Sequence, residues 1–209
     1  MKTFVKILSV GAIVSGSLLT SSVASADVSY NVGFVSEYYY RGIYQKNASA
    51  SAGIDYEQSG FYAGAWTADV GDGLEVDGYL GYGGEVGDFS YGVGFTGYYY
   101  TGDFDETYEE VNLSAGYGPV SIGYSIGEWD GDGGTDYDFL EVSIDLGAGF
   151  YGLYGSFGDE FDGDYFELGY GTTVSEIDLG VALIFPSDEL EGTDNAAGEG
   201  ITLSIGKSF

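Results

Sequence analysis

The stretch Gly198–Phe209, GEGITLSIGKSF, decides how the chain folds. Large apolar side chains recur at every second position from Ile201 to Ile205, and the positions between them, Thr202 and Ser204, are small and polar. Because successive side chains of a β-strand point to opposite faces, this pattern predicts a strand with one apolar and one polar side. Such a strand fits a soluble sheet, or a membrane barrel whose apolar side chains face lipid and whose polar side chains face the lumen.

The same alternation recurs along the chain and favours the barrel. Twelve alternating segments can be marked between Val28 and Phe209. Every second connection between them is tight, as at Gly118-Pro119, and the others are longer and rich in Asp and Gly. We therefore expect an all-β fold, a transmembrane antiparallel β-barrel of about 12 strands with short periplasmic turns and longer acidic extracellular loops. An even number of strands would put both termini of the barrel chain on the periplasmic side.

Some features stay open at this point. For Phe61–Asp69 and Phe150–Phe157 the alternation does not decide which side chains point inward. The first connection is expected to be a loop from Arg41 to Asn47. The alternative fold is a soluble all-β sandwich, but that fold does not account for a face rich in Gly, Ser and acids on nearly every segment.

Residues 1–26 have the pattern of a secretory signal peptide. Two lysines precede the apolar run Ile7–Leu19, and a segment rich in Ser and Ala ends at Ala26. We therefore expect cleavage near Ala26, leaving an outer-membrane β-barrel of residues 27–209. The apolar run is shorter than the roughly 20 residues that a membrane helix needs, and no other stretch comes closer. The expected location is the bacterial outer membrane.

Charge and residue usage exclude several classes of protein. Beyond residue 26 the chain carries 34 acidic residues and three basic ones, Arg41, Lys46 and Lys207, so its net charge is −31. This balance excludes a nucleic-acid partner, because neutralising phosphates requires clustered Lys and Arg. Without His or Cys the chain cannot form a Ser-His catalytic pair, a reactive thiol or a His/Cys zinc site. We therefore predict that it is not an enzyme.

Charged side chains on the polar face of the predicted strands would line the lumen. The predicted pore-lining residues are Glu37, Arg41, Asp55, Glu75, Asp77, Glu110, Glu141, Asp145, Glu167 and Asp178. A wall with so many acids favours cations. We therefore predict a porin-like channel for passive diffusion of small solutes or ions, with a preference for cations. Two alternatives stay open: some acids pair with Arg41 or with water, and the barrel is a structural or adhesive protein with a plugged lumen.

Aromatic residues gather at both ends of the predicted strands, as the two interfaces of a membrane select. Those near the longer loops are Tyr38–Tyr40, Tyr98–Tyr100, Tyr108, Trp129, Tyr137 and Phe185. Those near the tight turns are Tyr56, Phe61, Phe89, Tyr117, Phe150 and Phe209. The alternative is that these residues simply favour strands.

The acidic loops raise the question of metal ions. Asp130, Asp132, Asp136 and Asp138 alternate with glycines and could hold Ca²⁺ weakly through oxygen ligands, but the EF-hand spacing and its bidentate Glu are missing. We expect no cofactor beyond loosely bound Ca²⁺ or Mg²⁺ at the acidic loops, which would keep these loops from repelling lipopolysaccharide. The other expected partners are outer-membrane lipid, the barrel assembly machinery, and small solutes or cations. The solute and the oligomeric state stay open.

The segment Ser36–Gln45, SEYYYRGIYQ, resembles the S-x-Y-x-[FY]-R-G-x-x-Q segment of the TorF family of porins. Gly60–Gly64, GFYAG, and Trp66 are also similar to that family, whereas Tyr44 departs from the Ser expected at its position. The resemblance extends over residues beyond the signal in length and layout, and implies an outer-membrane barrel that acts as a porin, without catalytic residues. Phe209 resembles the terminal aromatic that the barrel assembly machinery reads as its signal.

Overall fold

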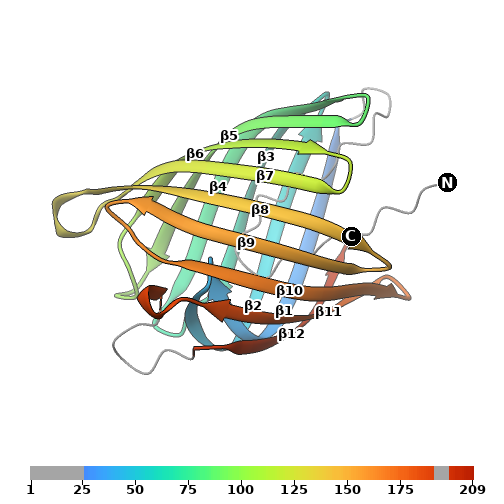
Figure 1. The fold of residues 1–209 in the computed structure, drawn as a ribbon. Coiled ribbons are helices and arrows are strands. Elements are labelled where there is room, and N and C mark those ends of the chain that lie inside the picture. Colours follow the sequence, from blue (N-terminus) through green and yellow to red (C-terminus); the bar gives the residue numbers. More distant parts are fainter. Residues whose placement is uncertain (1–25, 191–197) are drawn as a thin grey trace.

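Twelve strands close into an antiparallel barrel in which each strand pairs with its neighbours in sequence and β12 pairs with β1 (Figure 1). The computed structural model describes residues 26–190 and 198–209, so the predicted signal peptide lies outside the described residues except for Ala26. The strands are β1 (Asp27–Tyr40), β2 (Ile43–Gln58), β3 (Phe61–Asp69), β4 (Leu74–Val86), β5 (Phe89–Thr101), β6 (Tyr108–Tyr117), β7 (Val120–Trp129), β8 (Thr135–Gly147), β9 (Phe150–Asp159), β10 (Asp164–Val174), β11 (Ile177–Pro186) and β12 (Gly200–Ser208). The predicted fold class is confirmed.

The connections differ between the two ends of the barrel. At one end, the turn end, all five connections are two residues long, as at Ser59-Gly60. Ser59 and Gly60 have φ angles of 52° and 88°, the left-handed pair that two-residue hairpins require. At the other end, the loop end, β1 and β2 are also joined by two residues, but the other connections are longer. These include the short 3-10 helices η1 (Gly131–Gly133) and η2 (Asp188–Leu190). No helix of the described residues is long and apolar enough to cross a membrane.

The outer surface of the barrel is apolar. In β12 the side chains of Ile201, Leu203 and Ile205 are 59, 58 and 49 % exposed, whereas Thr202 between them is buried. Every other strand except β2, β3 and β9 likewise exposes several large apolar side chains at alternate positions. Aromatic residues expected near the tight turns are exposed there as well: Phe61, Phe89, Tyr117, Phe150 and Phe209.

The inner face is lined by small residues towards the turn end. The inward positions of β5, β6 and β7 in this part of the barrel hold Ser90, Gly92, Gly94, Ser114, Gly116, Ser121 and Gly123. Ser114 and Ser121 are exposed, although they lie on the inner face. Solvent therefore reaches the inside of the wall at Ser114 and Ser121.

Two strands have facings that the sequence did not decide. In β9 the side chains of Tyr151, Leu153 and Phe157 are buried on the inner face, although Phe150 is exposed on the outer face, so this strand carries large side chains on both faces. In β3 the inner face carries Trp66 and the buried Ala68. Both strands therefore contribute apolar side chains to the interior.

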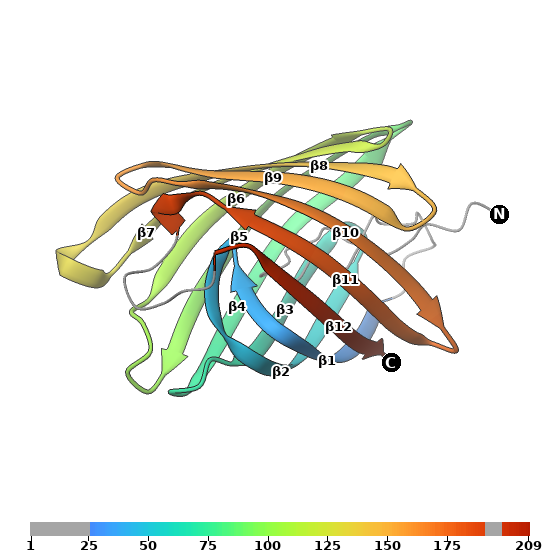
Figure 2. The same ribbon diagram turned by 60° about the horizontal axis from the view of Figure 1, so that its bottom comes forward.

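Near the loop end, the hairpin formed by β1 and β2 leaves the wall and folds into the barrel. β1 pairs with β12 only as far as Val35, and β2 pairs with β3 only from Ser51 onwards. Between these points β1 and β2 pair with each other alone, up to Tyr40 opposite Ile43. The departure of this blue hairpin from the wall can be followed in Figure 2. We call residues 36–50 the inward hairpin.

The inward hairpin corrects the loop that was expected from Arg41 to Asn47. The connection is only the two-residue turn Arg41-Gly42, and Asn47 already belongs to β2. Polar residues before Asn47 suggested a loop, but Lys46 is satisfied by an ion pair with Asp69 at 2.8 Å, while its backbone stays paired with β1.

Most aromatic residues expected at the loop-end interface lie inside the barrel instead. The buried ones are Tyr38, Tyr39, Tyr40, Tyr98 and Tyr137, whereas Tyr99 and Phe185 are exposed. The inward hairpin is the physical reason, because it gives the aromatic rings of the wall an interior partner. Tyr40 and Tyr98, for example, meet edge to face with their ring centroids 5.6 Å apart.

Candidate functional site

The tip of the inward hairpin is the centre of the candidate site. Arg41 and Gly42 form its turn, and their φ angles are 49° and 82°. For an arginine this left-handed conformation costs roughly 1–2 kcal/mol, which other contacts have to offset. A Cβ atom on Gly42 would lie 2.7 Å from the ring of Tyr165 on β10, so glycine is required both by φ and by this close approach.

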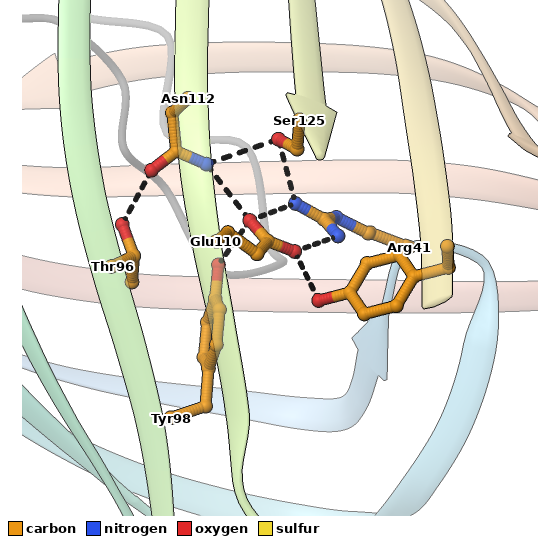
Figure 3. Close-up of polar contacts among 7 residues, drawn as sticks. Arg41, Thr96, Tyr98, Glu110, Asn112 and Ser125 are labelled. Carbon is orange, nitrogen blue, oxygen red and sulfur yellow. Dashed lines mark hydrogen bonds and ion pairs between the residues drawn. The ribbon is translucent and has the colours of Figure 1, made fainter. Parts of the chain in front are cut away.

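Arg41 reaches from the hairpin to Glu110 on β6 (Figure 3). Its guanidinium group makes two contacts with the Glu110 carboxylate, one of them from Nη2 to Oε2 at 2.9 Å. Nη2 also donates to Ser125 Oγ at 3.3 Å, and the guanidinium carbon lies 4.2 Å from the ring centroid of Phe139. The side chains of the pair are 11 and 0 % exposed. Because bidentate Arg–carboxylate pairs are strong and directional, this contact fixes the hairpin to the wall. We call Arg41, Glu110 and the side chains that hydrogen-bond to them the latch.

Further hydrogen bonds hold Glu110 in place. The Tyr137 hydroxyl donates to Oε1 at 2.7 Å, and Asn112 Nδ2 donates to Oε2 at 2.8 Å. Asn112 Nδ2 also donates to Ser125 Oγ at 3.0 Å, and Asn112 Oδ1 accepts a bond from Thr96 Oγ1 at 2.8 Å. A buried carboxylate is tolerated when its charge is balanced and its oxygens are hydrogen-bonded, as here.

A second pair of predicted pore-lining acids, Glu75 and Asp77 on β4, lies against the hairpin without a base. The Tyr38 hydroxyl donates to Glu75 Oε1 at 2.7 Å. Both acids are buried, and no ion pair of the described residues involves them. Glu75 Oε2 and Asp77 Oδ1 have no hydrogen-bond partner.

An apolar cluster fills the interior on the other side of the hairpin. It consists of Tyr39, Tyr137, Phe139, Leu153, Phe157, Tyr165, Ala182, Ile184 and Leu190. Nearly every strand was expected to present a face of Gly, Ser and acids to the lumen, and at the loop end this expectation is wrong for β8 to β11. A hairpin that folds inside the barrel needs an apolar surface to bury its own rings, and the cluster provides that surface.

Two other predicted pore-lining acids are fixed by neutral groups. Asp55 Oδ2 accepts a hydrogen bond from Asn31 Nδ2 at 3.2 Å, and the Tyr79 hydroxyl donates to the same carboxylate. Glu167 Oε1 accepts a hydrogen bond from the Tyr151 hydroxyl at 2.5 Å. Both acids lie on the inner face, and neither has an ion pair within the described part of the chain.

The remaining predicted residues lie apart from the latch. Glu141 is half-buried on the inner face of β8, and Asp145 is exposed near the turn end of the same strand. Asp178 accepts a hydrogen bond from Thr173 Oγ1 at 2.6 Å. Glu37 lies on the inward hairpin itself, but Arg41 pairs with Glu110 rather than with this neighbour.

The structure thus brings Arg41, Glu110, Glu75 and Asp77 together around the hairpin and distributes the other acids over the lumen wall. Sequence reasoning did not identify the neutral residues of the latch, Asn112, Ser125 and Tyr137, as functional partners. One signal pointed to the site: a single arginine after three tyrosines, in a chain with 34 acids.

The acidic loop predicted as a weak Ca²⁺ site is split between two elements. Asp130 precedes η1, whereas Asp136 and Asp138 lie on β8 with the buried Tyr137 between them; the side chain of Asp132 lies outside the described residues. Among the residues that the structure describes, no group of three or more acids could hold a metal ion. Loose binding of Ca²⁺ at this loop stays a prediction.

The architecture defines the class of the protein as a closed twelve-stranded antiparallel β-barrel with an apolar exterior and an inward hairpin. The chain belongs to the family described as "Bacterial protein of unknown function (Gcw_chp)", whose model matches residues 20–158. A search among curated proteins finds no significant match. Because the family description carries no function, the resemblance to the TorF family stays a prediction.

The barrel is also similar to solved structures from Pseudomonas aeruginosa. OccK2 (OpdF), in complex with glucuronate, has 16 % sequence identity and a TM-score of 0.43, and the match covers 78 % of this chain and 59 % of that one. OccK1 (OpdK) has 16 % identity and a TM-score of 0.42, with 79 and 57 % covered. The chain therefore spans less than two thirds of the length of these proteins, and at this identity the likeness concerns the barrel architecture alone.

Proposed function

We propose that the protein is an outer-membrane channel for passive diffusion of small solutes or ions, constricted near the loop end by the inward hairpin. The observation that carries the proposal is a wall one strand thick that is wet inside and apolar outside. Ser114 is exposed on the inner face, and its neighbour Leu113 is 44 % exposed on the outer face. An apolar surface of this extent is stable when lipid covers it, and a closed barrel satisfies its backbone hydrogen bonds within the membrane.

We also propose that the channel prefers cations. The inner face between the hairpin and the turn end carries Asp55, Glu141, Asp145, Glu167 and Asp178. The two bases of the inward hairpin, Arg41 and Lys46, are paired with Glu110 and Asp69. Like charges in a low-dielectric wall hold a negative potential that concentrates cations, and salt weakens this effect by shortening the screening length to about 3 Å at 1 M.

A structural or adhesive barrel with a plugged lumen is the second candidate. The observation that favours it is the burial of the hairpin tip, where Tyr39 and Tyr40 are 1 and 8 % exposed and Arg41 is paired with the wall. In this case the hairpin would be a permanent plug, and the acidic loops would act outside the cell.

The proposed orientation places the turn end in the periplasm and the loop end outside the cell. Phe209 is 68 % exposed at the turn end, and its backbone N–H donates to the carbonyl of Tyr30 at 2.9 Å. This position suits the proposed signal for the barrel assembly machinery. The loops would contact lipopolysaccharide with the help of loosely bound Ca²⁺ or Mg²⁺. The layout and Ser36–Gln45 support membership of the TorF porins.

Conductance across a planar bilayer tests the proposal. We would compare the refolded protein with a variant in which residues 37–47 are replaced by an Asn-Gly turn, which suits a two-residue hairpin and keeps Val35 opposite Ser49. Conductance of the unaltered protein would establish the channel, and conductance of the shortened variant alone would favour the plugged barrel. If neither conducts while both are folded, the channel proposal is wrong. The reversal potential in a KCl gradient tests selectivity, and a preference for Cl⁻ would exclude the cation channel.

A further inference from the structure

The wall of the barrel has a gap in its strand pairing next to the inward hairpin. β12 pairs with β11 as far as Gly200, whereas its pairing with β1 ends at Ser204. On the other side of the gap, β3 pairs with β4 up to Asp69 but with β2 only up to Ala68. Both strands therefore stay extended beyond the point at which β1 and β2 leave them. Strand edges of this kind are templates for further strand pairing.

Contacts across the gap already follow the register of the β1–β12 ladder. Continued beyond Val35, this ladder would put Glu37 opposite Thr202. Two residues further, Tyr39 would lie opposite Gly200. In the structure Thr202 Oγ1 donates to the carbonyl of Glu37 at 3.1 Å, and a Cβ atom on Gly200 would lie 2.1 Å from the Tyr39 hydroxyl oxygen. The residues that the continued ladder would pair therefore lie close together already, but through side chains rather than through their backbones.

The gap also offers an outer position to a side chain of the hairpin. In the continued ladder Tyr38 would lie opposite Ile201, whose side chain is exposed on the outer surface. Because residues directly opposite each other share a face of the sheet, Tyr38 would point outward at the loop end. Aromatic residues at the ends of transmembrane strands suit the membrane interface. In this structure the same side chain is buried instead, and its hydroxyl donates to Glu75 on the inner wall.

The inward position of the hairpin is costly in two ways. Arg41 at the tip has a left-handed φ angle of 49°, which is unfavourable for a residue with a Cβ atom. Next to Tyr38, Glu75 is 0 % exposed, and its Oε2 atom has no hydrogen-bond partner. No basic side chain of the described residues pairs with this carboxylate, and burial of an unpaired charge is strongly disfavoured. The latch and the apolar cluster have to offset both costs.

We propose that the inward hairpin has a second position, in the gap between β12 and β3, and that its movement between the two positions gates the lumen. In the second position β1 and β2 would extend their ladders with the wall, and Tyr38 would face the membrane interface. The latch would open, so that water would reach Glu110 and Glu75. The inference rests on the proposed channel only for the flow of solutes, because the movement itself does not require a channel.

Thiol labelling measures the movement. The chain has no cysteine, so Ala68→Cys introduces a single thiol, in the buried cluster that Ala68 forms with Tyr38 and Val70. A water-soluble methanethiosulfonate, added to the refolded full-length barrel in vesicles, should reach this thiol when the hairpin leaves. Labelling should be faster than unfolding, which heat-dependent mobility in detergent gels measures separately. Ser114→Cys, on the exposed inner face, is the control for access of the reagent and should react without delay.

Breaking the latch should shift the hairpin towards the second position. Arg41→Met in the Ala68→Cys background removes the hydrogen bonds from the guanidinium group to Glu110 and Ser125. Hydrogen bonds to charged groups are strong enough to change an equilibrium by about tenfold or more, so labelling should accelerate by at least that factor. If Ala68→Cys does not fold, Ala182→Cys, which is buried in the apolar cluster on the other side of the hairpin, takes its place.

Two engineered disulfides test the positions themselves. Tyr38→Cys combined with Ile201→Cys should cross-link in the folded barrel and hold the hairpin in the gap. Gly42→Cys combined with Tyr165→Cys should hold the hairpin inward. A Cβ atom at residue 42 would lie 2.8 Å from Cβ of Tyr165, within about 1 Å of the spacing that a disulfide needs.

Conductance of the cross-linked barrels in planar bilayers shows whether the movement gates the lumen. The disulfide that holds the hairpin in the gap should raise the conductance, the disulfide that holds it inward should abolish the conductance, and reduction should reverse both effects. Ser114→Cys combined with Gly123→Cys is the matched control, because these residues lie opposite each other in the wall, and its disulfide should have neither effect.

Three outcomes would overturn the proposal. Labelling of Ala68→Cys that is no faster than unfolding, or that Arg41→Met does not accelerate, would exclude the movement. Failure of Tyr38→Cys to cross-link with Ile201→Cys in the folded barrel would exclude the position in the gap. Equal conductance of the two cross-linked forms would exclude the gate. Rapid labelling in a barrel that does not conduct would support the movement and refute the channel, so the two proposals fail separately.

Discussion

Removing the charge of Arg41 should leave the buried carboxylate of Glu110 without a counter-charge. In Arg41→Met the side chain can still cover Phe139, but both contacts with Glu110 and the hydrogen bond to Ser125 disappear. Glu110 is 0 % exposed and keeps only neutral hydrogen-bond partners. Breaking a buried ion pair by removing one partner typically costs about 3–5 kcal/mol, so we expect a loss of that order in the free energy of unfolding.

A double-mutant cycle isolates the contribution of the pair. Glu110→Gln should be destabilising because it leaves the guanidinium group of Arg41 without its anion. Arg41→Met combined with Glu110→Gln leaves neither charge uncompensated, so its loss should be smaller than the sum of the two single losses by about 1–3 kcal/mol. Residue 41 has the same left-handed backbone whether it is Arg or Met, so the strain of this conformation cancels in the cycle.

Urea unfolding in lipid vesicles measures these free energies, and tryptophan fluorescence shows which part of the protein responds. Trp66 lies 6.3 Å from Tyr38 of the inward hairpin, measured between ring centroids, whereas Trp129 packs beside Tyr108 of the wall. A Trp129→Phe background therefore reports on the hairpin, and a Trp66→Phe background on the wall. Additive losses in the cycle would refute the latch, because uncoupled residues do not depend on each other's charge.

Two further predictions concern the wall and the tip of the hairpin. Leu113→Arg should destabilise the barrel by about 2–4 kcal/mol in a bilayer, whereas Ser114→Arg on the inner face should be tolerated; equal losses, measured by refolding into vesicles, would contradict the assigned facing. Gly42→Ala should cost more stability than Gly87→Ala, because a Cβ at residue 42 would meet the ring of Tyr165 whereas residue 87 has open space around it, and both have positive φ. Equal urea midpoints for the two variants would show that the tip does not contact β10.

The wall of the barrel was predictable because its determinants are local. Alternation from Ile201 to Ile205 and the Gly-rich turns depend only on neighbouring residues, and the exposed face of β12 follows that pattern. The pattern was weaker in β9, where aromatic and small residues occur at both odd and even positions, so hydrophobicity does not decide the facing. There the inner face is set by an interior cluster of residues from distant strands, which no local pattern reveals.

The inward hairpin was not predictable for the same physical reason. Its position depends on Glu110 and Tyr165, which lie far from Arg41 in sequence, and on an interior that is apolar where a pore wall was expected to be polar. The sequence alone does not show which of the nine predicted pore-lining acids pairs with Arg41. The segment that resembles the TorF family marked the right place, residues 36–45, but not its fold.

The departure of the hairpin from the wall also limits how deep the barrel can sit in a bilayer. Above Val35 the edges of β12 and β3 lose their neighbouring strands, and side-chain hydroxyl groups replace part of the missing pairing. Ser36 Oγ accepts a bond from the Leu203 N–H at 2.8 Å, and Ser49 Oγ donates to the carbonyl of Asp69 at 2.7 Å. Partly paired backbone is costly in hydrocarbon, so the apolar layer should end at this seam, close to the exposed side chains of Leu203 and Ile201. The loop-end parts of the longer strands, including the latch, would then rise above the lipid tails.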